Sequence, residues 1–209
     1  MRLNLPNALT LFRIALLPVM VAVFYMHDVF PGVPLRAANA AAAGVFVLAS
    51  ITDWLDGWIA RRFNQSSAFG AFLDPVADKL MVAVTLFVLV QSHPTALLAI
   101  TAAVIVGREI AVSALREWMA FVGEHARVRV QWVGKVKTVV QIIAIIVLLL
   151  ERDKDAQLLR LWLVGETLLV IAAILTIWSG LAYLRAAWPA LRMDAPKPDS
   201  RPRTDTTPT

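Results

Sequence analysis

Apolar runs long enough to cross a lipid bilayer recur along most of this 209-residue chain and constrain its fold more than any other feature. A membrane-spanning helix needs about 20 predominantly apolar residues. Hydrophobic residues make up 59% of the chain and charged residues only 17%, which is the composition of a membrane protein rather than a water-soluble domain. The sequence therefore predicts an all-α integral membrane protein with six transmembrane helices, near residues 8–26, 37–60, 72–92, 95–118, 133–150 and 158–186.

The distribution of basic residues predicts how these helices are oriented, because cytoplasmic loops are enriched in lysine and arginine. If the amino terminus is cytoplasmic and the helices alternate, both termini and 16 of the 20 basic residues lie on the cytoplasmic side. The net charge of +5 is then concentrated beside anionic lipid headgroups. A basic chain would also suit nucleic acid, but the sequence contains no soluble basic domain, so we expect no nucleic-acid partner.

The connections between the apolar runs are short, which predicts one compact helical domain over residues 1–192. The remaining segment, residues 193–209, reads MDAPKPDSRPRTDTTPT and is rich in proline, threonine and charge. That composition predicts a disordered cytoplasmic tail. The chain contains no cysteine, so disulfides and thiolate metal sites are excluded.

Four aspartates lie within residues 53–78 of this apolar chain. Each would cost about 2.5–3.5 kcal/mol at the centre of a membrane helix, so a compensating partner is required. Asp53 and Asp56 share one arc of a helix, and Asp74 and Asp78, four residues apart, share one side of the next. Two antiparallel helices would bring both pairs together. Oxygen-only ligands favour Mg²⁺, Mn²⁺ or Ca²⁺ over zinc, and four carboxylates are enough for a two-metal site.

A structural role is the alternative for one of these aspartates. Asp74 precedes Pro75, and such a pair often begins a helix as its N-cap and first residue. Capping does not account for two pairs on two facing stripes. Small residues at positions 57, 60 and 70 also leave room for a flat ligand to approach the backbone.

The segment reads D-x2-D-G-x2-A-R-x8-G-x3-D-x3-D without a departure, and this pattern resembles the signature of the CDP-alcohol phosphotransferase (phosphatidyltransferase) family of membrane enzymes. The resemblance implies six helices, a site for two divalent ions (Mg or Mn) at the cytoplasmic side, and displacement of CMP from a CDP-activated lipid by an alcohol. We expect the metal ligands to be the four aspartates, with Asp78 also accepting the proton of the attacking hydroxyl: Asp53, Asp56, Asp74 and Asp78.

The resemblance extends to other segments. NLPNALTLFRIALLPV (residues 4–19), GREIAVSALREWMA (107–120) and WVGKVKTVVQ (132–141) are similar to the bacterial subgroup that makes phosphatidylglycerophosphate from CDP-diacylglycerol and sn-glycerol 3-phosphate. This implies a multi-pass protein of the bacterial inner membrane with its active site facing the cytoplasm. It also implies a set of residues around the CDP group: Asn7, Thr10, Arg13, Gly57, Ala60, Arg61 and Gly70.

A phosphorylated acceptor needs an anion site of its own. Arg108 and Arg116 lie about 80° apart around one helix, and Lys135 and Lys137 begin the next helix on the same membrane side. Arginine suits bidentate phosphate contacts and lysine supplies a point charge, so we expect these four residues to bind the acceptor phosphate. The alternative is that they are topology markers or contacts to lipid headgroups.

Two other functions stay open at this stage. The same family includes enzymes with other acceptors, namely inositol phosphate, serine or phosphatidylglycerol. A divalent-cation transporter could also use intramembrane carboxylates, although the sequence shows little sign of the paired broken helices that transporters often contain. Membrane lipids are expected partners, and a homodimer is compatible with the resemblance.

Overall fold

The computed structural model describes residues 5–63, 68–121, 132–151 and 159–192, and the regular structure within them is helical. Each predicted apolar run falls almost entirely within one long helix. A short helix, α2 (Met26–Val29), lies in the connection after the first of them. The long helices are α1 (Leu5–Phe24), α3 (Leu35–Phe63), α4 (Ala68–Ser92), α5 (Ala96–Phe121), α6 (Trp132–Leu150) and α7 (Leu159–Arg192).

Length and apolar composition make several of these helices candidates to cross a membrane. Among the described residues, four stretches qualify, Asn7–Phe24, Leu35–Asp56, Ala96–Ala120 and Arg160–Arg185, and Val136–Leu150 is a shorter apolar stretch. Large apolar side chains such as Trp54, Phe87 and Trp178 are exposed on the outside of the molecule. A surface of this kind suits lipid tails better than water. The chain is therefore an all-α integral membrane protein, as predicted.

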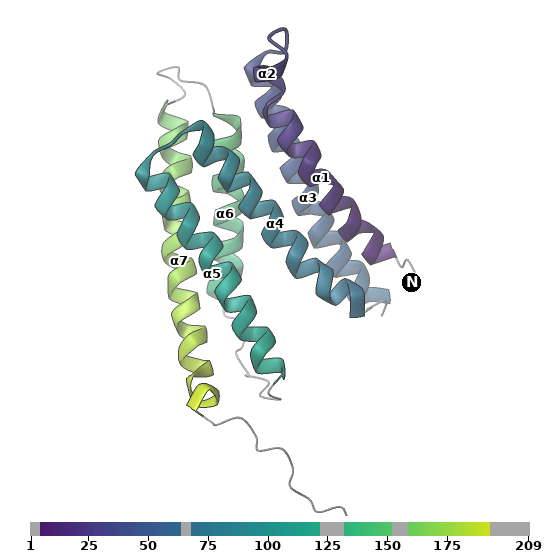
Figure 1. The fold of residues 1–209 in the computed structure, drawn as a ribbon, viewed down its shortest axis with the longest axis vertical. Coiled ribbons are helices and arrows are strands. Elements are labelled where there is room, and N and C mark those ends of the chain that lie inside the picture. The colour runs from purple at the N-terminus through teal and green to yellow at the C-terminus, as the bar shows by residue number, and fades with distance from the viewer. Residues whose placement is uncertain (1–4, 64–67, 122–131, 152–158, 193–209) are drawn as a thin grey trace, which may run out of the picture.

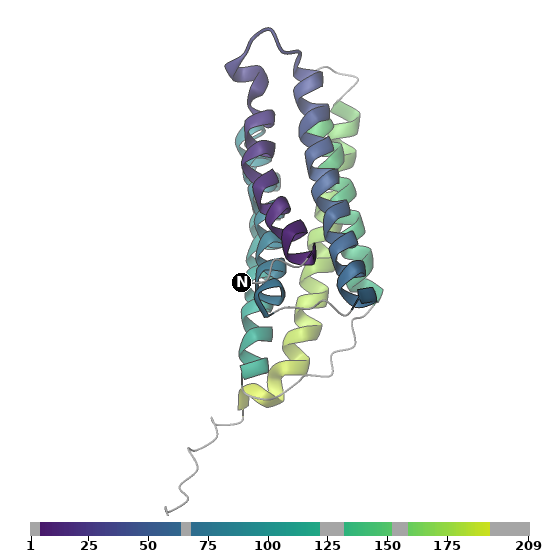
Figure 2. The ribbon, with the colours of Figure 1, turned by 90° about the vertical axis from the view of Figure 1, so that its right-hand side faces the viewer.

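The helices form two groups joined by α4. Helix α1 packs on α3 and α4, while α5 and α6 both pack on α7. Contacts between α3 and α6 and between α4 and α5 connect the groups, and Figure 1 shows α4 running obliquely from one group to the other. The start of α1, the end of α3 and the start of α4 lie toward the end of the molecule at which α7 finishes (Figures 1 and 2).

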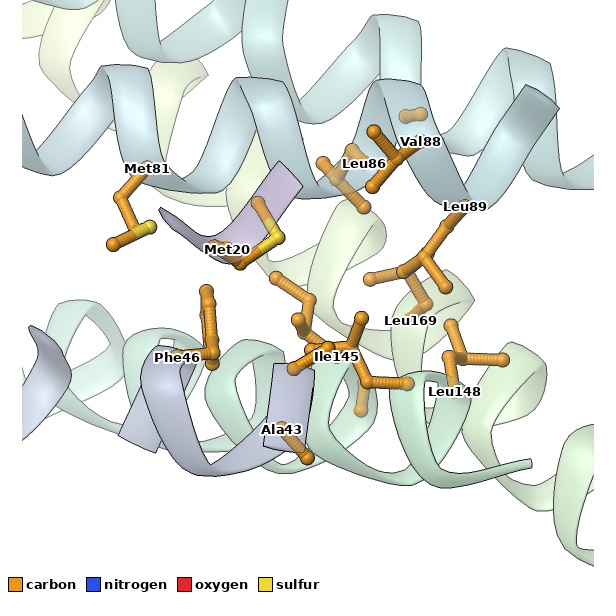
Figure 3. Close-up of a cluster of buried hydrophobic side chains, with 14 of the residues drawn as sticks. Met20, Ala43, Phe46, Met81, Leu86, Val88, Leu89, Ile145, Leu148 and Leu169 are labelled. Carbon is orange, nitrogen blue, oxygen red and sulfur yellow. The ribbon is translucent and has the colours of Figure 1, made fainter. Parts of the chain in front are cut away.

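An apolar core fills the space where these groups meet. Met20 of α1, Phe46 of α3, Met81 of α4, Ile145 of α6 and Leu169 of α7 all belong to it (Figure 3). Small side chains let membrane helices approach closely, and three alanines from the alanine-rich run of α3 are buried: Ala38, Ala42 and Ala43.

The predicted division between a domain over residues 1–192 and a disordered tail stays a prediction, because residues 193–209 lie outside the described part of the chain.

Candidate active site

Three buried polar residues lie on one side of α1. Asn7, Thr10 and Arg13 follow one another at intervals of three and are all nearly inaccessible in an otherwise apolar helix. Residues three apart on a helix are neighbours on its surface. Since α1 packs against both α3 and α4, this polar stripe lies between the two helices that carry the aspartates.

The guanidinium of Arg13 contacts three aspartates from two helices. Its Nη2 donates to Oδ2 of Asp56, and its Nη1 donates to Oδ1 of Asp78. The same Nη1 lies 3.1 Å from Oδ1 of Asp53. Only 2% of the arginine side chain is exposed. One buried cation therefore ties the carboxylates of α3 to those of α4.

The fourth aspartate joins the site through Thr10, whose hydroxyl donates to Oδ1 of Asp74. The structure thus brings both predicted aspartate pairs to one place, with α1 between them. We call Asp53, Asp56, Asp74 and Asp78 the aspartate cluster. The capping alternative for Asp74 is wrong, because α4 begins at Ala68, more than a helical turn earlier.

Exposure separates the members of the aspartate cluster. Asp56 is 3% exposed, whereas Asp53 and Asp78 are 48% and 44% exposed. The buried Asp56 anchors the arginine, and the other two carboxylates are open to a ligand.

Of the other residues expected around the CDP group, Gly70 is buried early in α4. Gly57, Ala60 and Arg61 belong to α3 just beyond the aspartates, but their side chains lie outside the described part of the structure.

The aspartate cluster fits divalent ions by its chemistry but not in its present arrangement. Among the described residues, no three His, Cys, Asp or Glu side chains are placed so that they could hold one metal ion. The guanidinium of Arg13 lies where the carboxylate oxygens converge. The donor atoms themselves are the oxygens that Mg²⁺ and Mn²⁺ prefer. Three carboxylates share a single guanidinium, so the cluster holds more acidic groups than cationic ones and suits further cations.

A second group of charges has the opposite balance. Lys137 of α6 donates to Oε1 of Glu109 on α5, and Nη1 of Arg108 lies 3.8 Å from the same oxygen. Nη2 of Arg108 donates to the hydroxyl of Ser179 on α7 at 2.8 Å. We call Arg108, Glu109 and Lys137 the cation cluster. Its two cations share one carboxylate, so a positive charge remains for an anionic ligand.

The structure gives less detail for the other two predicted phosphate-binding residues, Arg116 and Lys135. The guanidinium of Arg116 lies over the ring of Tyr183, 5.5 Å from the ring centroid. Tyr183 lies one helical turn beyond Ser179 on α7, so both arginines reach the same side of that helix. Lys135 belongs to the first turn of α6, but its side chain lies outside the described part of the structure.

A cleft of about 360 Å³ between α4, α5 and α6 connects the two clusters. Asp78 and Lys79 line it from α4, Glu109 from α5, and Thr138 and Gln141 from α6, with aliphatic side chains making up most of the remaining wall. Oε1 of Gln141 is buried without a hydrogen-bond partner among the described residues. One cleft therefore contains a carboxylate of the aspartate cluster and the shared carboxylate of the cation cluster.

Sequence reasoning missed the residues that hold the cations in place. Glu109, Ser179 and Tyr183 all contact predicted phosphate-binding residues. Glu109 had a usable signal, because an ionisable residue within an apolar helix usually has a partner or a function. Ser179 and Tyr183 had none, since their partners lie some 70 residues away and depend on how α7 packs against α5.

Comparisons with known proteins agree on one family. The family model described as CDP-alcohol phosphatidyltransferase matches residues 3–178. A CDP-diacylglycerol–glycerol-3-phosphate 3-phosphatidyltransferase of Pseudomonas fluorescens is 48% identical over 201 residues, covering 93% of this chain and 95% of the relative. Proteins of the same name from Yersinia pestis (strain Pestoides F) and Shigella flexneri serotype 5b are 46% and 45% identical, each covering 90% of this chain.

Proposed function

The chain belongs to the CDP-alcohol phosphatidyltransferase family, and on that premise we propose that it transfers the phosphatidyl group of CDP-diacylglycerol to sn-glycerol 3-phosphate. CMP leaves, and the product is phosphatidylglycerophosphate, a step of phospholipid biosynthesis. The observation that carries the proposal is the shared cleft, which has Asp78 of the aspartate cluster at one wall and Glu109, the carboxylate that Lys137 contacts, at another. The sequence relatives, which bear this activity in their names, support the same acceptor.

The aspartate cluster is the proposed site for two divalent ions, Mg or Mn, with ligands from Asp53, Asp56, Asp74 and Asp78. When bound, such ions neutralise the charge of the CDP diphosphate and of the phosphoryl group during transfer. Asn7, Thr10 and Arg13 of α1, with Gly57, Ala60, Arg61 and Gly70, surround the nucleotide.

Asp78 accepts the proton of the attacking hydroxyl. Its carboxylate is partly exposed and lines the cleft, so an acceptor in the cleft can reach it. The acceptor oxygen attacks the phosphorus bonded to the diacylglycerol, the bond from that phosphorus to the oxygen of CMP breaks, and the proton passes to Asp78. Oε1 of Gln141, at the wall of the same cleft, is a suitable acceptor for another hydroxyl of the glycerol.

The acceptor phosphate binds at the cation cluster, with Arg116 and Lys135 nearby. The guanidinium of Arg108 is held by Ser179, which leaves it oriented for a phosphate oxygen. Lys137 is nearly buried, so its charge acts in a region of low dielectric constant and attracts an anion more strongly than it would in water.

The orientation of the chain follows from the basic residues. We place six spans in a bacterial inner membrane, with both termini and the active site at the cytoplasmic face. The start of α1 and the end of α7 lie toward the same end of the molecule, which supports this orientation (Figure 1). A homodimer is a further proposal, which native mass spectrometry in detergent would test.

The test is CMP release by detergent-purified protein given CDP-diacylglycerol and Mn²⁺ or Mg²⁺. Glycerol 3-phosphate, inositol phosphate, serine and phosphatidylglycerol are offered separately, with Asp78→Asn as the inactive control. We expect turnover with glycerol 3-phosphate alone. Turnover with another acceptor would overturn the acceptor assignment and keep the family chemistry. No turnover with any acceptor, in folded protein that transports Mn²⁺ into vesicles, would favour the divalent-cation transporter instead.

A further inference from the structure

Arg13 is unusual among the charged residues that the structure describes. Its guanidinium is almost completely buried near the carboxylates of Asp53, Asp56 and Asp78, and it contacts all three. A single carboxylate would be enough to pair one arginine. The position of Arg13 at the centre of the aspartate cluster therefore needs an explanation beyond simple charge pairing.

We propose that Arg13 is an internal counter-cation: it occupies the aspartate cluster in the metal-free protein, gives up the carboxylates when divalent ions bind, and moves to the diphosphate of the nucleotide. This inference rests on the proposed function, since it concerns the same metal and nucleotide sites. It adds a role for Arg13 that its expected place beside the nucleotide does not include.

Acidic groups repel one another within the metal-free site. Four carboxylates from two helices are brought together around Arg13 and Thr10, and like charges repel more strongly beside the buried Asp56 than they do in water. Removing the partner of a buried charge is strongly destabilising. Arg13 connects α3 and α4 through these carboxylates, so it holds the two halves of the site together before any metal arrives.

A divalent ion and the guanidinium compete for the same oxygens. Mg²⁺ requires oxygen ligands at about 2.0–2.1 Å in near-octahedral geometry. In the described residues, no three acidic or histidine side chains are arranged for this, and the guanidinium contacts oxygens of Asp56 and Asp78 that would serve as ligands. A divalent ion and Arg13 cannot occupy the centre of the aspartate cluster together, and their charges repel. Metal binding therefore displaces the arginine.

A displaced Arg13 needs another anionic partner. Arg13 lies on the buried polar stripe of α1 with Asn7 and Thr10. Its Nε is buried and has no hydrogen-bond partner among the described residues. A diphosphate offers a guanidinium the bidentate contacts that it prefers. Binding of the nucleotide and binding of metal then favour each other, and this coupling is necessarily reciprocal.

The experiment measures Mn²⁺ affinity rather than activity. The dissociation constant of Mn²⁺ is determined by the electron paramagnetic resonance signal of free Mn²⁺, for detergent-purified full-length protein with and without CDP, corrected for the Mn²⁺ that CDP binds in solution. Thermal unfolding in EDTA reports the stability of the metal-free protein. The variants are Arg13→Gln and Arg13→Lys.

Asn39→Ala is the matched control. Asn39 is also a buried polar residue, and it donates to the backbone carbonyl of Leu150, so its loss disturbs the contact between α3 and α6. It lies almost four helical turns from Asp53 on the same helix. We expect Asn39→Ala to lower the unfolding temperature and to leave Mn²⁺ affinity unchanged.

Without CDP, we expect Arg13→Gln to bind Mn²⁺ about tenfold more tightly than the unmodified protein, within the usual size of coupling between two sites. In EDTA it unfolds at a lower temperature. CDP improves Mn²⁺ affinity less in this variant than in the unmodified protein. If Arg13→Gln does not fold, Arg13→Lys carries the same test with smaller changes, because an ammonium group cannot bridge three carboxylates as a guanidinium does.

Equal or weaker Mn²⁺ binding by the Arg13 variants would overturn the inference, as would an unchanged effect of CDP. Those outcomes leave the proposed function intact, provided the unmodified protein binds Mn²⁺ and CDP. If the unmodified protein binds no Mn²⁺ even with CDP, the proposed metal site fails and this inference fails with it.

Discussion

The aspartate cluster and the cation cluster have opposite charge arrangements. In the first, three carboxylates surround one guanidinium, that of Arg13. In the second, Arg108 and Lys137 share one carboxylate, that of Glu109. Both are partly buried between helices, and one cleft joins them. Each site thus contains an excess of one charge and a single residue of the opposite charge.

This difference shows how one apolar bundle can keep two highly charged ligand sites close together. The excess charge sets the ligand class, cations in the first site and an anion in the second. The minority charge keeps the excess groups from repelling one another when the ligand is absent, since an unpaired buried charge is strongly destabilising. Variants of both clusters test whether they follow this common rule.

The largest effect is expected in the aspartate cluster, for Asp78→Asn. The amide keeps the shape of the side chain but cannot accept the proton of the acceptor hydroxyl. General-base catalysis contributes about 10²–10⁴-fold, so we expect kcat for CMP release to fall by about that factor, as measured with saturating substrates. A loss of less than about tenfold, in protein that still binds Mn²⁺, would mean that another group accepts the proton.

The next effect is expected in the cation cluster, for Lys137→Met. Hydrogen bonds to charged groups contribute about 1.5–3 kcal/mol, so KM for glycerol 3-phosphate should rise roughly ten- to a hundredfold, with KM for CDP-diacylglycerol unchanged. Lys137→Arg should restore much of the acceptor affinity.

The double variant Lys137→Met/Glu109→Gln separates binding from stability. Lys137→Met alone leaves Glu109 without its partner and should lower the unfolding temperature. The double variant removes both charges of the pair, so its unfolding temperature should return toward that of the unmodified protein. The raised KM should persist. Recovery of KM together with stability would show that Lys137 supports the fold and does not bind phosphate.

A smaller effect is expected for Glu109→Gln, which tests directly whether the single opposite charge in a cluster competes with the ligand of that cluster. If Glu109 competes with the acceptor phosphate as Arg13 competes with metal, its neutralisation lowers KM for glycerol 3-phosphate about twofold to fivefold at low salt, and it lowers the unfolding temperature. A higher KM would break the comparison, because Glu109 would then act by aiming Lys137 at the phosphate.

The smallest effect is expected for Gly180→Ala on α7. An added Cβ would lie 3.1 Å from Nε and 3.2 Å from Cγ of Arg108, so the arginine must shift by a few tenths of an ångström. Overpacking of this kind costs about 1–3 kcal/mol, and we expect KM for glycerol 3-phosphate to rise a few-fold. Gly107→Ala is the matched control, since a Cβ there meets nothing within 4 Å, and it should leave KM unchanged without destabilising the protein.

Much of the fold and part of the site were predictable from local patterns. Runs of about 20 apolar residues determine membrane helices because a buried backbone must satisfy its own hydrogen bonds, and each of the six runs falls largely within one helix. Helical spacing put Asp74 and Asp78 on one side of α4 and set Arg108 and Arg116 about 80° apart around α5. The motif of residues 53–78 was sufficient to indicate the family.

Only the tertiary structure decided which charges meet. Arg13 lies 40 residues from Asp53 and 65 from Asp78, and no spacing rule connects positions so far apart. Their contact depends on α1 packing between α3 and α4. Likewise, Glu109 meets Lys137 because α5 and α6 lie beside the same cleft. Sequence periodicity extends over a few residues along one helix, so it determines which residues share a helix face. Which residues of different helices come into contact depends on packing, and packing involves the whole bundle at once.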